Sequence, residues 1–174
     1  MQSVKVVITG PFDAGKTTFI RSVSEITVLS TERQVTDATE GDGETTVAMD
    51  FGRITVSDDV VLYLFGTPGQ SRFSFMWETL SEGMLGFVLL VDASRPETFA
   101  DAREMIGFFT ERSDVPFVVA ANKVDAEEVT RLQDMHVELG LAPSVPLLPM
   151  DARSRDSVKS VLLGLLHEIL KGMS

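Results

Sequence analysis

Short apolar runs rich in β-branched residues recur along the chain, each bounded by Gly, Pro or Asp. The runs are Val4–Thr9, Val60–Phe65, Phe87–Val91, Phe117–Ala121 and Val145–Leu148. Their length and composition predict buried strands. Between them lie stretches with helical spacing of apolar residues, most clearly from Val158 to Leu170. Strands that alternate with helices predict an α/β protein in three layers, built around a mainly parallel sheet.

Two segments depart from this alternation. Only three residues separate the extended run Val47–Val56 from Val60–Phe65, which predicts a hairpin with one antiparallel edge strand. The sheet is therefore expected to have six strands. The segment Thr31–Glu44 is polar and acidic with few apolar residues, which predicts a mobile loop. No repeat or linker divides the chain, so residues 1–174 are expected to form a single domain.

Charge and composition exclude several classes of function. Lys and Arg total 15 against 26 Asp and Glu, and the formal charge of −11 disfavours nucleic acid as the main partner. The absence of cysteine excludes disulfides, thiolate metal sites, cysteine nucleophiles and prenyl or palmitoyl attachment. The longest apolar stretch, Met84–Val91, is too short to span a bilayer, and the N-terminus lacks a signal-peptide pattern. We therefore expect a cytoplasmic protein without an intrinsic membrane anchor.

A glycine-rich segment, GPFDAGKT at residues 10–17, follows the first predicted strand and opens the first helix. It matches the phosphate-loop pattern GxxxxGK[ST] in the context that the pattern requires. Gly10 and Gly15 let backbone amides turn toward a β-phosphate, Lys16 can reach the β- and γ-oxygens, and the Thr17 hydroxyl can ligate Mg²⁺. The predicted phosphate-binding set also includes Asp13, Ala14 and Thr18.

A second motif, NKVD at residues 122–125, follows the apolar run Phe117–Ala121 at the sheet edge where open α/β folds bind ligands. The Asp125 carboxylate could accept both the N1–H and the N2–H₂ of guanine. Adenine lacks this pair of donors and would leave the carboxylate unpaired. The Asn122 amide would tie the base-binding loop to the phosphate loop. Lys123 belongs, with Asn122 and Asp125, to the predicted nucleotide-binding residues. The alternative is an ordinary turn after a strand, since Asn and Asp favour turns.

With these motifs the chain resembles the Ras-like small GTPases over almost its whole length. The family motif DxxG followed by Gln has a counterpart in GTPGQ at residues 66–70, and the Rab-like string TIGVDF in TVAMDF at residues 46–51. The Ser-Ala-Lys guanine loop has a looser counterpart in Asp151-Ala152-Arg153. The resemblance implies a P-loop NTPase fold of the G-domain type, with GTP or GDP as ligand and Mg²⁺ as cofactor.

The resemblance also implies roles for single residues. Thr46 would sense the γ-phosphate and hold Mg²⁺ together with Thr17. Gly69 would give its amide to the γ-phosphate, and Gln70 would orient the attacking water. Ala152 would present its amide to the guanine O6. Lys16, Thr46 and Gln70 would thus be the catalytic set, in line with the positioning and charge neutralisation that phosphoryl transfer needs.

Two positions depart from the Ras pattern. Gly66 stands where most members have the Asp that holds Mg²⁺ through water, so an acidic residue such as Asp37, Asp42 or Glu44 would have to compensate. Phe12 stands where Ras proteins have a small residue, and its ring would crowd an incoming arginine finger. Arg53 and Arg72 flank the switches as candidate arginines in cis, although solvated charges are the stronger interpretation.

The departures, together with the strings LFGTPGQ and AMDFGRI, resemble bacterial Ras-like GTPases of the MglA type and the conservon group of actinomycetes. This likeness implies a regulatory partner of the roadblock/LC7 type. An aromatic run after Gln70 would supply a partner surface or ordinary core contacts; its members are Phe73, Phe75, Met76 and Trp77. His136 and His167 lack partners at ligand spacing, so no zinc site is expected.

Three functions follow from these motifs. The first is a GTP-dependent switch that hydrolyses GTP slowly alone and faster with a partner. The second is a GTP-binding interaction module deficient in hydrolysis, as Gly66 and Phe12 would allow. The third is a P-loop ATPase or small-molecule kinase, which needs an acceptor site and usually an arginine-rich lid, neither of them visible in the sequence. A partner could also recruit the protein peripherally to a membrane.

Overall fold

The computed structural model describes residues 1–36, 44–124 and 129–173. Its centre is one sheet of seven strands in the order β2-β3-β4-β1-β5-β6-β7. The strands are β1 (Gln2–Thr9), β2 (Leu29–Thr36), β3 (Glu44–Ser57), β4 (Val60–Gly66), β5 (Gly86–Asp92), β6 (Phe117–Asn122) and β7 (Leu147–Met150). Four neighbouring pairs are parallel: β4 with β1, β1 with β5, β5 with β6, and β6 with β7. The other two pairs, β2 with β3 and β3 with β4, are antiparallel.

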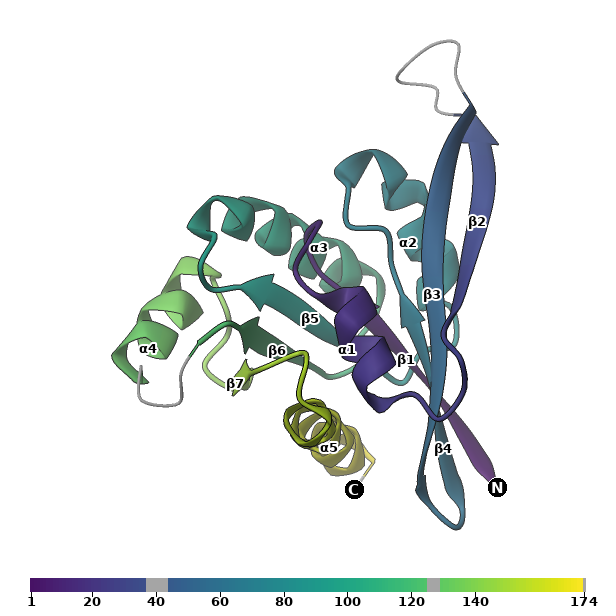
Figure 1. Cartoon of the computed structure of the whole chain (residues 1–174). Helices are drawn as coiled ribbons and strands as arrows, with labels where there is room; N and C mark the ends of the chain where they lie inside the picture. Colours follow the sequence, from purple (N-terminus) through teal and green to yellow (C-terminus); the bar gives the residue numbers. More distant parts are fainter. Residues whose placement is uncertain (37–43, 125–128, 174) are drawn as a thin grey trace.

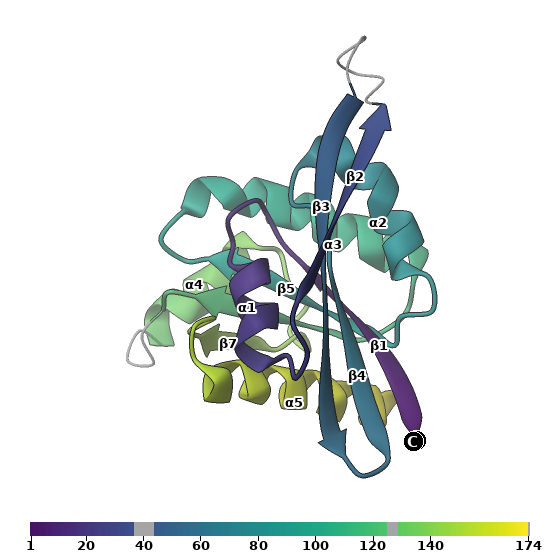
Figure 2. The same ribbon diagram turned by 45° about the vertical axis from the view of Figure 1, so that its right-hand side comes forward.

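Helices cover both faces of the sheet, as Figures 1 and 2 show. They are α1 (Lys16–Val23), α2 (Ser74–Ser81), α3 (Phe99–Arg112), α4 (Val129–Glu138) and α5 (Arg155–Gly172). Alternate residues of β5 point to opposite faces, so Val88 and Leu90 pack with α1 and α5, whereas Phe87, Leu89 and Val91 pack with α2, α3 and α4. The predicted α/β class, the three layers and the mainly parallel sheet are confirmed.

The sheet has a seventh strand that the six-stranded prediction lacks. Leu29–Thr36 pairs with Glu44–Phe51, and the two strands form an arm that extends beyond the rest of the sheet (Figure 1). The prediction of a loop over Thr31–Glu44 is therefore wrong for residues 31–36 and for Glu44. An edge strand needs backbone partners more than apolar side chains, so polar composition is a poor guide there. Asp37 and Asp42 lie outside the described residues.

The last strand is also displaced, because β7 runs over Leu147–Met150 rather than Val145–Leu148. Pro149 has no amide hydrogen, but β7 is an edge strand, where proline is tolerated. The shift puts the residues that follow Met150 at the same edge of the sheet as Asn122, which is paired with Met150. Within the described residues, no helix combines the length and apolar content that crossing a membrane requires.

Candidate functional site

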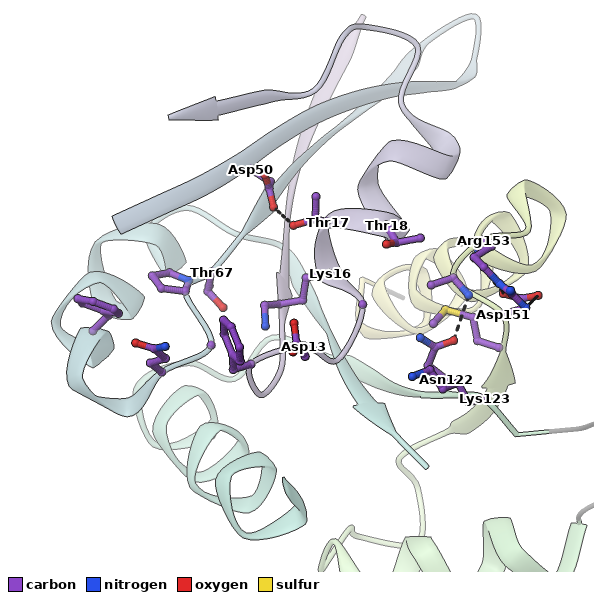
Figure 3. A pocket seen from close by; sticks show the side chains of 18 of the residues that line it. Asp13, Lys16, Thr17, Thr18, Asp50, Thr67, Asn122, Lys123, Asp151 and Arg153 are labelled. Carbon is purple, nitrogen blue, oxygen red and sulfur yellow. Dashed lines mark hydrogen bonds and ion pairs between the residues drawn. The ribbon is translucent and has the colours of Figure 1, made fainter. Parts of the chain in front are cut away.

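An open cleft of about 1010 Å³ lies at the carboxyl ends of the parallel strands. Figure 3 shows its lining, with Asp50 and Thr17 on the β3 side and Asn122, Lys123, Asp151 and Arg153 on the opposite side. Most of the predicted site residues line it, namely Asp13, Gly15, Lys16, Thr17, Thr18, Gly69, Gln70, Asn122, Lys123, Asp151, Ala152 and Arg153. Gly10 and Ala14 belong to the same loop between β1 and α1. Asp125 lies outside the described residues.

The loop between β1 and α1 has the backbone of an anion-binding turn. Gly10, Asp13 and Gly15 have positive φ angles of 148°, 64° and 109°. α1 begins directly after Gly15, and no side chain of the described residues caps its first amides. The unpaired amides and the helix dipole therefore favour a bound anion at this end of α1.

Lys16 is the cation at the centre of this loop. Its Nζ donates to the carbonyl oxygens of Gly10 at 2.5 Å and Pro11 at 2.8 Å. Burial lowers the pKa of Lys16 to about 8, although Asp50 and Asp13 pull it upward. The buried amine thus lacks a full counter-charge, which the oxygens of a phosphate would supply.

The lowered pKa predicts that phosphate binding takes up a proton. A bound anion restores the charged amine, so nucleotide affinity should fall as the pH rises through about 8. Titration calorimetry at about pH 9 in buffers of different ionisation enthalpy should give buffer-dependent binding heats. A Lys16→Met variant, if it binds at all, should lose this dependence. Equal heats in all buffers for the wild type would contradict the prediction.

A carboxylate faces Thr17 from β3, although sequence reasoning did not identify it. The Thr17 hydroxyl donates to the Asp50 carboxylate. Asp50 pairs with Gly66 across the two strands, and a Cβ added at Gly66 would lie 3.4 Å from the Asp50 Cβ. The Asp50 side chain therefore lies beside the position where Gly66 has none. Asp50 is the fifth residue of TVAMDF at residues 46–51. Counting residues back from the turn of the predicted hairpin places it opposite Gly66.

Thr46 lies farther along the same strand. Its backbone pairs with Gln34 in the arm. It lies four residue steps before Asp50 in the strand, about 13 Å away at the usual rise per residue. This conformation therefore does not bring the Thr46 backbone to Thr17, and the metal and catalytic roles of Thr46 stay predictions.

The segment after β4 packs directly on the phosphate loop. A Cβ added at Gly69 would lie 2.5 Å from the Phe12 amide nitrogen and 2.8 Å from the Lys16 Nζ. Trp77 of α2 is hydrogen-bonded to this segment, because its Nε1 donates to the Pro68 carbonyl at 2.8 Å. Gly69 thus fills the space beside Lys16, and only a residue without a side chain fits there.

Gln70 and Arg72 meet at the mouth of the cleft. The Arg72 Nε donates to the Gln70 Oε1 at 3.0 Å, and both side chains line the cleft. Arg53 is not among the described lining residues, and its buried Nε has no hydrogen-bond partner in the described part of the chain. Of the two candidate arginines in cis, the geometry therefore favours Arg72.

The aromatic run after Gln70 divides between core and surface. Phe73, Met76 and Trp77 are buried. Phe75 is 53% exposed, and Phe12 at the mouth of the cleft is 58% exposed. Most of the run is therefore core, and Phe75 and Phe12 are the exposed large apolar side chains among the described residues near Gln70.

Asn122 joins the two halves of the cleft. Its Nδ2 donates to the Ala14 carbonyl and its Oδ1 accepts from the Ala152 amide, both at 3.2 Å. Asp151 and Arg153 form an exposed ion pair at 3.2 Å beside it. One buried side chain thus fixes the distance between the phosphate loop and the loop after β7.

The chain matches the family described as conserved hypothetical ATP binding protein over residues 27–162, starting after α1. Uncharacterized protein MJ1339 of Methanocaldococcus jannaschii is 34% identical over 126 residues, 72% of this chain and 73% of the relative. ADP-ribosylation factor-like protein 8c of Arabidopsis thaliana is 25% identical over 143 residues (80% and 71%). The Ypt/Rab-type GTPase YPT7 of Saccharomyces cerevisiae is 27% identical over 157 residues (84% and 70%).

The Arf-like and Rab-type relatives support the likeness to Ras, Rab and Arf-type small GTPases at low identity, while the narrower MglA-like assignment stays a prediction. Because the family match extends over more than half of the chain, the chain belongs to the family of conserved hypothetical ATP binding proteins.

Proposed function

We propose that residues 1–174 form a single G domain that acts as a guanine-nucleotide-dependent switch, binding GTP and GDP and slowly hydrolysing GTP. The observation that carries the proposal is the Asn122 bridge between Ala14 and Ala152, because it couples a phosphate-binding loop to a loop at the base end of the same cleft. The similarity to Arf-like and Rab-type proteins supports it.

The phosphates would bind at the N-terminus of α1 and on Lys16. Thr17 and Asp50 fit a Mg²⁺ ion, because hydroxyl and carboxylate oxygens are the ligands it prefers and the two already face each other. When bound, Mg²⁺ neutralises charge on the phosphate oxygens. Asp50 would serve in place of the carboxylate that Gly66 lacks, either directly or through water.

The base would bind beyond Asn122. Asp125 would accept from the guanine N1–H and N2–H₂. The Ala152 amide, held by the Asn122 Oδ1, would share its hydrogen with the guanine O6, and Asp151 and Arg153 would border the base.

The third phosphate would drive the switch. Gly69 packs against Phe12 and Lys16, so a γ-phosphate bound to Lys16 requires the segment around Gly69 to move outward. Its amide would then donate to the γ-phosphate, and Gln70, released from Arg72, would orient the attacking water. Thr46 would need a larger rearrangement of β3 to join them. The single tryptophan, Trp77, bonds to this segment, so its fluorescence would follow the movement.

The Mg²⁺ assignment predicts the effect of removing one charge. Asp50→Asn keeps an oxygen that accepts from Thr17 but loses the carboxylate, so the Mg²⁺ affinity of the nucleotide-bound protein should fall about 10-fold or more. The measurement is a Mg²⁺ titration of nucleotide release. Asp58→Asn, at the exposed turn between β3 and β4, is the matched control and should leave the midpoint unchanged. An unchanged midpoint in Asp50→Asn would exclude this carboxylate from the site.

The guanine assignment is tested at Asp125. Asp125→Asn replaces an acceptor by a donor facing the guanine N1–H, so GTP affinity should fall at least about 100-fold. Xanthosine triphosphate, which presents an oxygen in place of the N2 amino group, should bind the variant better than GTP does. Competition against a fluorescent nucleotide measures both affinities. Wild-type GTP affinity in the variant would remove Asp125 from the base site.

ATP is the second candidate ligand, favoured by the family description as an ATP binding protein. ATP that competes as well as GTP would support it. A hydrolysis-deficient GTP-binding module also remains an alternative, and a Gln70→Ala variant with the wild-type GTP lifetime in the presence of a partner would support that alternative.

Regulation would come from partners at the segment around Gln70. Phe12 and Phe75 are the exposed apolar side chains there, and a roadblock/LC7-type regulator is the partner that the sequence resemblance implies. Such a partner would stimulate hydrolysis and could recruit an otherwise cytoplasmic protein to a membrane.

A further inference from the structure

A hydroxyl group of α1 reaches the loop after β7, and the proposed function does not use it. The Ser22 Oγ donates to two carbonyl oxygens, that of Thr18 in its own helix at 2.8 Å and that of Ala152. A bond to the carbonyl four residues back is ordinary for a serine in a helix. The contact with Ala152 is different, because it shares the single hydroxyl hydrogen with a residue 130 positions away. Ser22 therefore ties α1 to the loop at the base end of the cleft.

Ala152 is held through both of its peptide groups. Its amide donates to the Asn122 Oδ1 at 3.2 Å, and its carbonyl accepts from Ser22. The residue is only 2% exposed, and a Cβ added at Gly15 would lie 3.5 Å from the Ala152 Cβ. The direction of the Ala152 amide is therefore restricted from two sides, and Ser22 supplies one of them.

The contacts around this loop come from three elements. Asn122 belongs to β6, Ser22 to α1, and Ser157 of α5 accepts the Asp151 amide at 2.9 Å. α1 is also the helix whose N-terminus the proposed function places against the phosphates. Ser22 does not line the cleft in the described part of the chain. Its influence on a bound nucleotide must therefore pass through Ala152.

We propose that Ser22 is a positioning residue for base recognition, which holds the Ala152 carbonyl so that the amide of the same residue stays directed at the O6 of a guanine base. The inference deepens the proposed function and rests on it in one respect, that guanine binds beside Ala152. The effect of Ser22 should depend on the acceptor at position 6 of the purine. It should not depend on the number of phosphates.

The test compares GDP with 6-thio-GDP, in which sulfur, a weak acceptor, replaces O6 while the N1–H and N2–H₂ remain. Displacement of a fluorescent nucleotide from the full chain gives both affinities. Ser22→Ala should bind GDP about 10-fold more weakly than the wild type does, the effect of one hydrogen bond. The same variant should lose no more than about twofold for 6-thio-GDP. Ser22→Thr keeps the hydroxyl and should stay within about threefold of the wild type for GDP.

The matched control is Ser160→Ala. Ser160 of α5 is exposed and donates to the Asp156 carbonyl four residues back at 3.1 Å, so its removal tests the bond within a helix alone and should leave both affinities unchanged. Alanine favours a helix, so both alanine variants are expected to fold. The loss factor of Ser22→Ala should be the same for GMP as for GDP.

Wild-type GDP affinity in Ser22→Ala, or equal losses for GDP and 6-thio-GDP, would overturn the proposal and leave the guanine switch intact. A loss that is larger for GDP than for GMP would also overturn it, because Ser22 would then act on the phosphates. A wild type that does not bind GDP, or that binds ATP equally well, would contradict the proposed function itself, and the role of Ser22 would fall with it.

Discussion

Replacing Asn122 by alanine should lower nucleotide affinity about 100-fold and the free energy of unfolding by about 3 kcal/mol. Asn122 is buried, and its amide is the bridge between the Ala14 carbonyl and the Ala152 amide. Truncation leaves both groups without a partner, and each buried unpaired group costs roughly 1–3 kcal/mol. It also frees the two loops to move apart. Part of the binding free energy of a ligand that spans them is then used to order the loops, which lowers its affinity.

Affinity from nucleotide displacement and stability from urea unfolding measure the two effects. Asn122→Asp is the matched variant, because it keeps an acceptor for Ala152 but turns a carboxylate oxygen, a second acceptor, toward the Ala14 carbonyl. It should therefore be at least as unstable as Asn122→Ala, because two acceptors then face each other and a charged group is buried. Affinity within about twofold of the wild type in Asn122→Ala would contradict the bridging role.

Replacing Gly10 by alanine should cost at least about 3 kcal/mol in the free energy of unfolding. Gly10 has a φ of 148°, and an added Cβ would collide with the Leu90 carbonyl oxygen of β5. Leu90 lies in the centre of the sheet between two packed layers, so its backbone has little room to move. The variant should therefore be destabilised even without nucleotide.

Gly107→Ala is the control for this prediction. Gly107 lies in α3, and an added Cβ would meet nothing within 4 Å. The change should be neutral or stabilising by up to about 1 kcal/mol, because alanine favours a helix. Urea unfolding of both variants gives the comparison, and equal stabilities would contradict the close approach at Gly10.

The sequence predicts the layers of this fold because the buried strands and α5 each carry their own periodic signal. β5 is an example of a strand covered on both faces: Val88 and Leu90 are buried on one face, and Phe87 and Leu89 on the other. Such a strand appears in the sequence as an uninterrupted apolar run. β2 carries no such signal. It is an edge strand that pairs with Glu44–Phe51 of β3, so its existence depends on backbone pairing with the strand that follows it in the chain.

The site divides in the same way. The segments 10–17 and 122–125 are local motifs whose spacing alone predicts their roles, and residues from both line one cleft. Asp50 escapes such reasoning because its contact with Thr17 depends on strand register, which places it opposite Gly66. The distance of Thr46 from Thr17 and the packing of Gly69 on Lys16 are properties of one conformation, which a motif cannot predict.

The most direct test of the guanine-nucleotide switch is to incubate the purified protein with equal concentrations of GTP and ATP, with and without Mg²⁺. Bound and released nucleotides are then separated by chromatography over several hours. The switch predicts that the protein retains GTP in preference to ATP and that GDP forms slowly only with Mg²⁺. Equal retention of ATP, or formation of ADP in place of GDP, would contradict it.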